Sequence, residues 1–112
     1  ALLDRGVVLY AARVGDAVLG VGALADLGGR HGELKSMHTA AEARGRGVAR
    51  AILSALLDAA RANEMTRVSL ETGSAEMFAP ARALYAAHGF ETCPPFGDYI
   101  LDPLSVFMTR TR

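Results

Sequence analysis

A Gly-rich turn with two arginines lies near the middle of this 112-residue chain, between one segment typical of a strand and one typical of a helix. Its sequence is Arg44-Gly45-Arg46-Gly47-Val48-Ala49. Such a turn exposes backbone N–H groups, glycine lets the chain approach a ligand closely, and the following helix N-terminus carries about half a positive charge. Gly-rich turns also begin helices for structural reasons alone. The pattern therefore predicts a site for a diphosphate and leaves a purely structural turn as the alternative.

A strand leads into this turn and a helix follows it. Residues 33–39 alternate as a strand does, with Glu33, Lys35 and Met37 on one side, but neither side is wholly apolar. A strand of this kind often lines a site. Residues 48–62 carry apolar side chains at helical spacing on one broad face and polar ones on the other.

The rest of the chain predicts more strands and one more helix. Apolar segments at residues 7–13 and 18–24, separated by Gly15 and Asp16, indicate an antiparallel hairpin. The remaining predicted elements are a strand at 67–72, a helix from Pro80 to Ala87 or His88 that ends at Gly89, and strands at 90–93 and 105–110. We therefore expect a single α+β domain over residues 1–112, with a mixed sheet flanked by helices.

Composition and charge argue against several classes of protein. Twelve basic residues balance twelve acidic ones, so no bulk electrostatic field favours nucleic acid or anionic lipid. No apolar run approaches the roughly 18 residues that span a bilayer, and no leader pattern precedes the first strand. The single cysteine, Cys93, forms no internal disulfide, and His31 and His38 lack a third ligand at metal spacing. We expect a cytoplasmic protein with no metal, no nucleic-acid partner and no membrane partner.

Two motifs in this order resemble those of the GNAT N-acetyltransferase superfamily. The turn from Arg44 to Ala49 matches the pattern (Gln/Arg)-x-x-Gly-x-(Gly/Ala), and Leu84-Tyr85-Ala86-Ala87-His88-Gly89-Phe90 looks like Leu-Tyr-x-x-x-Gly-Phe. The resemblance implies a three-layer fold with a twisted, mostly antiparallel sheet, and acetyl-CoA as cosubstrate. The family's first strand and next two helices lack a counterpart, so the fold is expected to be truncated at its N-terminal side, with at most a helical remnant over residues 1–4.

The resemblance also implies which residues bind the cosubstrate. The turn would hold the CoA pyrophosphate through backbone N–H groups, and the preceding strand would pair with the pantetheine arm. The N–H of Met37 would face the thioester carbonyl and serve as an oxyanion donor. Phe78 occupies a position that is often Asn in the family, which puts one pantetheine contact in doubt. The predicted binding residues are Met37, His38, Thr39, Arg44, Gly45, Arg46, Gly47, Val48 and Ala49.

Two residues match the family's catalytic positions. Tyr85 matches the general acid, and a phenol with a pKa of about 10 can protonate a thiolate whose conjugate acid has a pKa of about 8.5. The alternative is a tyrosine that only anchors the helix. Glu33 lies where some members carry the general base that deprotonates the acceptor ammonium, directly or through water. Glu71 is the alternative carboxylate, and a solvated glutamate at a strand end is the structural alternative for Glu33.

These residues predict an N-acetyltransferase that moves an acetyl group to a primary amine of a small molecule by direct attack in a ternary complex. The alternative is a non-catalytic acyl-CoA-binding module. In the family, the two helices without a counterpart here form one wall of the acceptor pocket. Either this chain is a fragment, or a partner chain supplies the wall, or the acceptor site is unusually open. Free sheet edges would also favour a homodimer. Asp98, Tyr99 and Asp102, in a Pro-rich segment, either contact the acceptor or form a plain surface loop.

Overall fold

A computed structural model describes residues 2–3, 7–14, 16–45 and 47–111 of the chain. The elements lie close to their predicted positions. The strands are β1 (Leu2–Leu3), β2 (Val7–Val14), β3 (Ala17–Asp26), β4 (His31–Thr39), β5 (Arg67–Gly73), β6 (Glu91–Cys93) and β7 (Ser105–Thr111). The helices are α1 (Val48–Ala62) and α2 (Ala79–Ala87), with short 3-10 turns η1 (Ala41–Ala43) and η2 (Glu76–Phe78).

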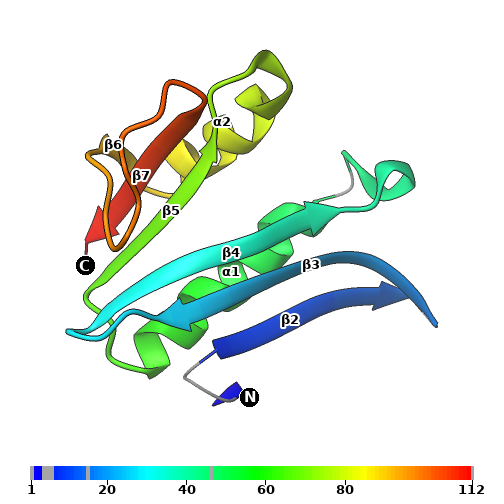
Figure 1. Ribbon diagram of the computed structural model, residues 1–112. Coiled ribbons are helices and arrows are strands. Elements are labelled where there is room, and N and C mark those ends of the chain that lie inside the picture. The colour runs from blue at the N-terminus through cyan, green and yellow to red at the C-terminus, as the bar shows by residue number, and fades with distance from the viewer. Residues whose placement is uncertain (1, 4–6, 15, 46, 112) are drawn as a thin grey trace.

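The described strands form one seven-stranded sheet in the order β1-β2-β3-β4-β5-β7-β6 (Figure 1). Each neighbouring pair is antiparallel except β4 and β5, which run parallel. Parallel neighbours need a crossover connection, and α1 lies in the connection between these two strands. The predicted mixed, mostly antiparallel sheet flanked by helices is confirmed.

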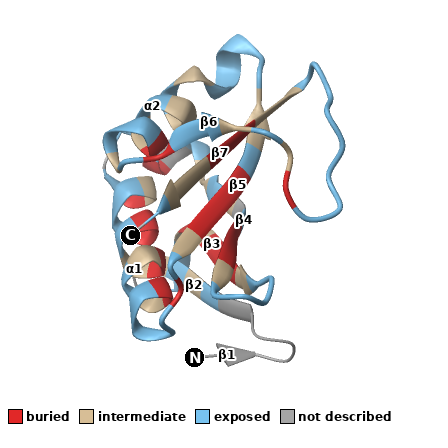
Figure 2. Cartoon of the chain, turned by 90° about the vertical axis from the view of Figure 1, so that its left-hand side faces the viewer, coloured by how far each residue is buried: buried red, intermediate tan, exposed pale blue. Residues whose placement is uncertain are grey.

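Both helices lie on the same face of the sheet (Figure 2). The apolar face of α1 buries Ile52, Leu53 and Leu56, and α2 adds Tyr85 to the same core cluster. The contact between α1 and the sheet is close: a Cβ added to Gly22 of β3 would lie 2.7 Å from Ile52 and 2.9 Å from Leu56. Glycine at this position therefore lets the helix approach the strand.

The opposite face of the sheet is covered in part by the irregular segment from Pro94 to Leu104. Its anchor is Phe96, which is buried and packs edge-on against Phe107 of β7 at a centroid distance of 6.0 Å. The same ring lies 5.7 Å from the ring of His31 on β4. The segment thus spans from β7 across to β4.

One local prediction is wrong. The sequence suggests at most a helical remnant over residues 1–4, whereas Leu2–Leu3 form a strand that pairs with Val7 and Val8. A segment this short is below the length at which a helix is stable, whereas the edge of β2 provides hydrogen-bond partners for its backbone groups. Neither α1 nor α2, the α-helices of the described residues, is long and apolar enough to cross a membrane.

Candidate active site

A cleft forms where the parallel strands β4 and β5 separate. The two strands pair from His31 and Arg67 as far as Leu34 and Leu70, and no further within the described residues. Beyond that point β4 stays paired with β3 and β5 stays paired with β7, so the strands diverge (Figure 1). The backbone groups along the diverging edges are therefore open to an extended ligand.

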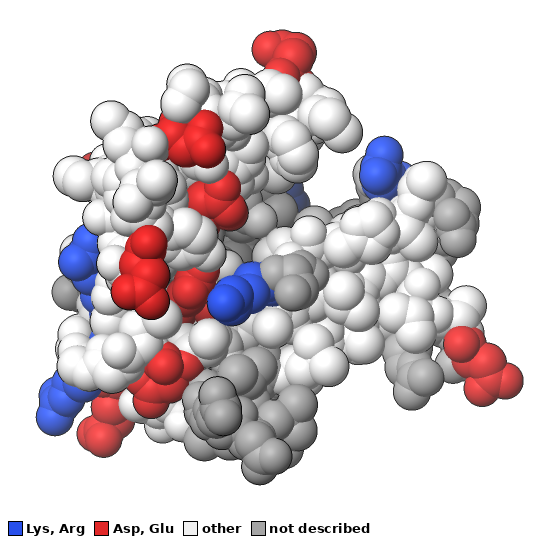
Figure 3. Space-filling view, viewed as in Figure 1, with Lys and Arg blue, Asp and Glu red and all other residues white. Residues whose placement is uncertain are grey.

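The cleft has a volume of about 570 Å³. This is within the range of roughly 300–1,000 Å³ that is usual for small-molecule sites. Figure 3 shows the hollow between the part of the molecule built on β2, β3 and β4 and the part built on β5 and β7. Residues from distant parts of the sequence meet there: Glu33, Lys35, Met37, Glu71, Phe78, Tyr85, Tyr99, Leu104 and Ser105 all line it.

Tyr85 lies on the wall of the cleft that α2 provides. Its side chain is only 6% exposed, and its ring packs edge-on against Phe90 at 5.9 Å. Burial raises the pKa of Tyr85 above its usual value of 10, so the phenol keeps its proton at neutral pH. Tyr85 is thus both a core residue and a cleft residue, and its two predicted roles are compatible.

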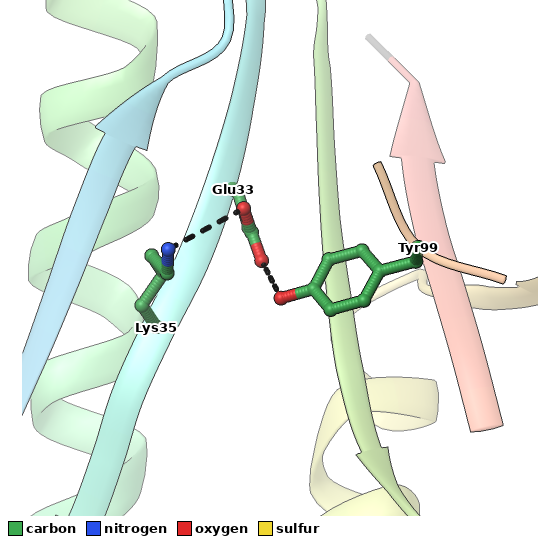
Figure 4. Close-up of polar contacts among 3 residues, drawn as sticks. All are labelled: Glu33, Lys35 and Tyr99. Carbon is green, nitrogen blue, oxygen red and sulfur yellow. Dashed lines mark hydrogen bonds and ion pairs between the residues drawn. The ribbon is translucent and has the colours of Figure 1, made fainter. Parts of the chain in front are cut away.

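Glu33 lies on the opposite side of the opening, on β4, and is only 5% exposed (Figure 4). Its Oε2 accepts a hydrogen bond from the Tyr99 hydroxyl at 2.5 Å, and its Oε1 lies 3.9 Å from Nζ of Lys35. A buried carboxylate needs such partners. Glu33 is therefore not the solvated strand-end glutamate that was one alternative.

Tyr99 comes from the segment between β6 and β7, 66 residues after Glu33. Its ring contacts Phe96 at 5.2 Å and Phe107 at 5.5 Å. The hydrogen bond to Glu33, burial, and the charges of Glu33 and Glu71 together raise the pKa of Tyr99 to about 12. The phenol therefore stays protonated at neutral pH and donates to the carboxylate.

The same segment contains two acidic residues that the sequence offered as acceptor contacts. Neither Asp98 nor Asp102 lines the cleft. Asp102 Oδ1 accepts a hydrogen bond from the backbone N–H of Leu104 at 2.8 Å and so shapes the turn before β7. Of the three residues considered in this segment, Tyr99 is the one that the fold brings to the cleft.

Glu71, the alternative carboxylate, lies on β5 and is exposed. Its Oε2 accepts a hydrogen bond from Ser105 Oγ at 2.5 Å. No local sequence pattern selects Ser105, because the pairing of β5 with β7 cannot be predicted from either strand alone. Figure 3 shows several acidic side chains on this face of the part of the molecule built on β5 and β7. Glu33 and Glu71 line the cleft, and their carboxylates favour a cationic ligand.

A β-bulge in β4 changes the expected position of Met37. Two residues of β4 lie opposite Gly22, which reverses the alternation of side chains along the strand. A Cβ added to Gly22 would lie 2.6 Å from the sulfur of Met37 and 2.7 Å from the side chain of Ile52 on α1. The prediction that Met37 shares a face with Glu33 is therefore wrong. Its side chain packs on the helix side of the sheet. The role as an oxyanion donor concerns the backbone N–H of Met37 and does not depend on the direction of the side chain.

The remaining predicted binding residues lie outside the cleft itself, at the end of β4 and in the turn into α1. They are His38, Thr39, Arg44, Gly45, Gly47, Val48 and Ala49. Arg46, which the sequence also selected, lies outside the described residues.

The backbone leading into α1 is left-handed at two glycines, and the helix begins without a side-chain cap. Gly45 and Gly47 have positive φ angles of 79° and 77°, and a Cβ added to either would have nothing within 4 Å. The helix has no acidic residue in its first turn and no side-chain cap. Its first N–H groups therefore have no intrahelical acceptors, and the helix dipole favours a negative ligand.

His31 belongs to a hydroxyl network next to the cleft. Its Nε2 lies 2.7 Å from Oγ of the fully buried Ser69, which lies 2.8 Å from Oγ1 of Thr109. Burial and then the charge of Arg67 lower the pKa of His31, against an opposing effect of Glu33. Within the described residues, no three His, Cys, Asp or Glu side chains are grouped to hold a metal ion. The network joins β4, β5 and β7 where the strands are still paired.

A seven-stranded mixed sheet that opens between two parallel strands and is flanked by helices is also the arrangement of solved acyl-CoA N-acyltransferase structures. Comparisons with known proteins agree: residues 2–90 match the acetyltransferase (GNAT) family. The chain therefore belongs to this family, and it is an acyltransferase by family and fold.

Individual relatives span most of this chain. The uncharacterized N-acetyltransferase YsnE of Bacillus subtilis (strain 168) is 47% identical over 104 residues, covering 93% of this chain and 69% of that protein. A protein of Klebsiella pneumoniae assigned as an acyl-CoA N-acyltransferase has a TM-score of 0.86 at 33% identity, over 94% of this chain and 72% of its own. A GNAT family acetyltransferase from Elizabethkingia anophelis with acetyl-CoA bound has a TM-score of 0.77 at 17% identity, over 93% of this chain and 75% of its own.

Proposed function

We propose that this chain transfers the acetyl group of acetyl-CoA to a primary amine of a small molecule by direct attack in a ternary complex. One observation carries the proposal: the opening between β4 and β5 has a buried carboxylate, Glu33, on one wall and a buried phenol, Tyr85, on another. Direct attack needs both a proton acceptor for the amine and a proton donor for the leaving thiolate.

Glu33 serves as the general base in this proposal. An alkyl ammonium ion must lose a proton before its nitrogen can attack, and Glu33 takes that proton directly or through water. Each carboxylate accepts a hydrogen bond from a hydroxyl at 2.5 Å, and Glu33 is preferred over Glu71 because it is buried, whereas Glu71 is exposed to solvent. A fixed carboxylate in a water-poor site is the better-positioned base.

Tyr85 serves as the general acid. The N–C bond forms as the C–S bond breaks, and the sulfur leaves with the bonding electrons and takes the Tyr85 proton. The amide nitrogen gives its second proton to the Tyr85 phenolate, which restores the phenol, and Glu33 passes the proton that it took from the ammonium to solvent, so one proton is released per turnover. The raised pKa of Tyr85 supports this role, since the group is protonated when the thiolate departs.

The residues of the chain suit acetyl-CoA as the cosubstrate. The turn from Arg44 to Gly47 and the open N-terminus of α1 suit the pyrophosphate, because they offer N–H groups and the first turn of α1 has no acidic residue. The unpaired edge of β4 suits the amide groups of the pantetheine arm. An acetyltransferase of the same fold from Elizabethkingia anophelis has acetyl-CoA bound, which supports the assignment.

The test is acetyl transfer to a panel of primary amines: ethylamine, 2-phenylethylamine, spermidine and L-lysine. Loss of the thioester absorbance reports turnover, and mass spectrometry identifies the N-acetylated product. We expect turnover with at least one amine, and a fall of about 100-fold or more in kcat for Glu33→Gln. A protein that binds acetyl-CoA and acetylates none of these amines would favour the non-catalytic acyl-CoA-binding alternative.

A further inference from the structure

The hydrogen bond between Tyr99 and Glu33 joins the wall of the cleft to the irregular segment between β6 and β7. We propose that Tyr99 is a positioning residue: its hydroxyl fixes the buried Glu33 carboxylate at the wall of the cleft, in the orientation that meets the acceptor amine. The inference rests on the proposed function, because it assigns the group that makes Glu33 effective as a base.

The ring of Tyr99 is held in place independently of Glu33. Phe96 and Phe107 contact it at centroid distances of 5.2 and 5.5 Å, and Phe96 is itself buried. The irregular backbone of the segment is thus held in place by an aromatic cluster that consists of Phe96, Tyr99 and Phe107. A hydroxyl on a fixed ring can hold a carboxylate more firmly than a group on a mobile side chain can.

The other polar partner of Glu33 does not supply the same constraint. Nζ of Lys35 lies 3.9 Å from the carboxylate, at the outer limit of an ion pair, and the Lys35 side chain is 51% exposed. Exposed pairs of this kind contribute little because the long side chain has many alternative conformations. Lys35 can therefore leave Glu33 when a cationic acceptor arrives, whereas Tyr99 stays.

The experiment is a double-mutant cycle on the amine that the panel above shows to be the best acceptor. Tyr99→Phe keeps the ring and its packing while removing the hydroxyl. We expect kcat/KM for the amine to fall about tenfold or more while the KM for acetyl-CoA stays unchanged. In the Glu33→Gln background the same change should have no further effect, because Tyr99 acts through that carboxylate. Tyr10→Phe, on β2, is the matched control and should leave every constant unchanged.

A spectroscopic measurement reports the contact without turnover. In protein labelled at tyrosine Cζ, the Tyr99 NMR signal is identified as the one that Tyr99→Phe removes. At pH 10.5 this signal should still be that of a protonated phenol in the wild type and that of a phenolate in Glu33→Gln. The difference is expected because the hydrogen bond to Glu33 is the main cause of the raised pKa of Tyr99. Equal titration of Tyr99 in both proteins would overturn the proposal.

The kinetic outcomes separate this proposal from the proposed function. Equal losses from Tyr99→Phe in the wild-type and Glu33→Gln backgrounds, or no loss in either, would overturn the positioning role and leave amine acetylation standing. Absence of amine acetylation in the wild-type protein would overturn both.

Discussion

Replacing Gly47 with alanine tests the phosphate turn most directly. Gly47 is the N-cap of α1 with a φ of 77°, and an added Cβ would meet nothing within 4 Å. The folded protein therefore bears only backbone strain, about 1–2 kcal/mol for a non-glycine residue in the left-handed region. For a domain of this size that loss lowers Tm by roughly 5 °C.

The chain offers a matched control in Gly28, at the other end of β4. Its φ is 84°, and a Cβ there would also meet nothing within 4 Å. Gly28→Ala should thus cost about the same stability as Gly47→Ala. Gly47 lies next to the open N–H groups of α1, and Gly28 does not. The methyl group added in Gly47→Ala should therefore obstruct the approach of a phosphate to these N–H groups, and the one added in Gly28→Ala should not.

The expected effect on binding follows from one lost contact. A hydrogen bond to a charged group contributes about 1.5–3 kcal/mol, and each 1.4 kcal/mol is about a factor of ten in Kd. Isothermal titration should therefore show acetyl-CoA binding roughly 10- to 100-fold more weakly to Gly47→Ala, and normally to Gly28→Ala. S-acetylpantetheine, which lacks the pyrophosphate, should bind both variants as it binds the wild type. Equal losses in the two variants, or none in Gly47→Ala, would refute the phosphate turn.

Three further outcomes are expected. Tyr85→Phe should lower kcat about 100-fold or more with little change in the Kd for acetyl-CoA, and unaltered turnover would remove the acid role. Leu53→Ala, at a fully buried position of α1, should lower the urea-unfolding free energy by about 2–5 kcal/mol, against almost no change for Leu101→Ala at an 83% exposed position. Burial lowers the pKa of His31 in the folded state below the usual 6.5, so the unfolded state binds the proton more readily. The free energy of unfolding should therefore fall as the pH drops below about 6.5. This fall should be shallower in His31→Gln, and identical pH profiles of the two proteins would contradict the reasoning.

The sequence predicts the regular elements well where period and boundary signals agree. The bounds of α1, Val48–Ala62, are those expected, because a strong apolar face begins directly after Gly47. A family motif likewise indicated Tyr85, and the position of Glu33 on the strand before the Gly-rich turn indicated the base; the fold brings both residues to one cleft. Local pattern is sufficient in these cases since each signal lies within the element that it defines.

Contacts between distant segments are the part that could not be predicted. The bond from Tyr99 to Glu33 crosses 66 residues and depends on an irregular segment whose course is set by the packing of Phe96, not by a period. The position of Met37 depends on a bulge that one strand pattern cannot reveal, because it arises from the register with β3. Both features concern pairing between elements, which a single sequence leaves open.

The cleft and the core depend on the same local feature of the sheet. The bulge of β4 lies opposite Gly22, and strand bulges bend the strand that carries them. The space left by Gly22 is filled by Met37, Ile52 and Leu56, so the packing of α1 and the course of β4 away from β5 are set together. A substitution at Gly22 would therefore alter the stability of the fold and the shape of the cleft together, so it cannot distinguish the two effects. The hydroxyl of Tyr99 is different, because its aromatic cluster is complete without it, and the function of the cleft can be tested there with the fold kept intact.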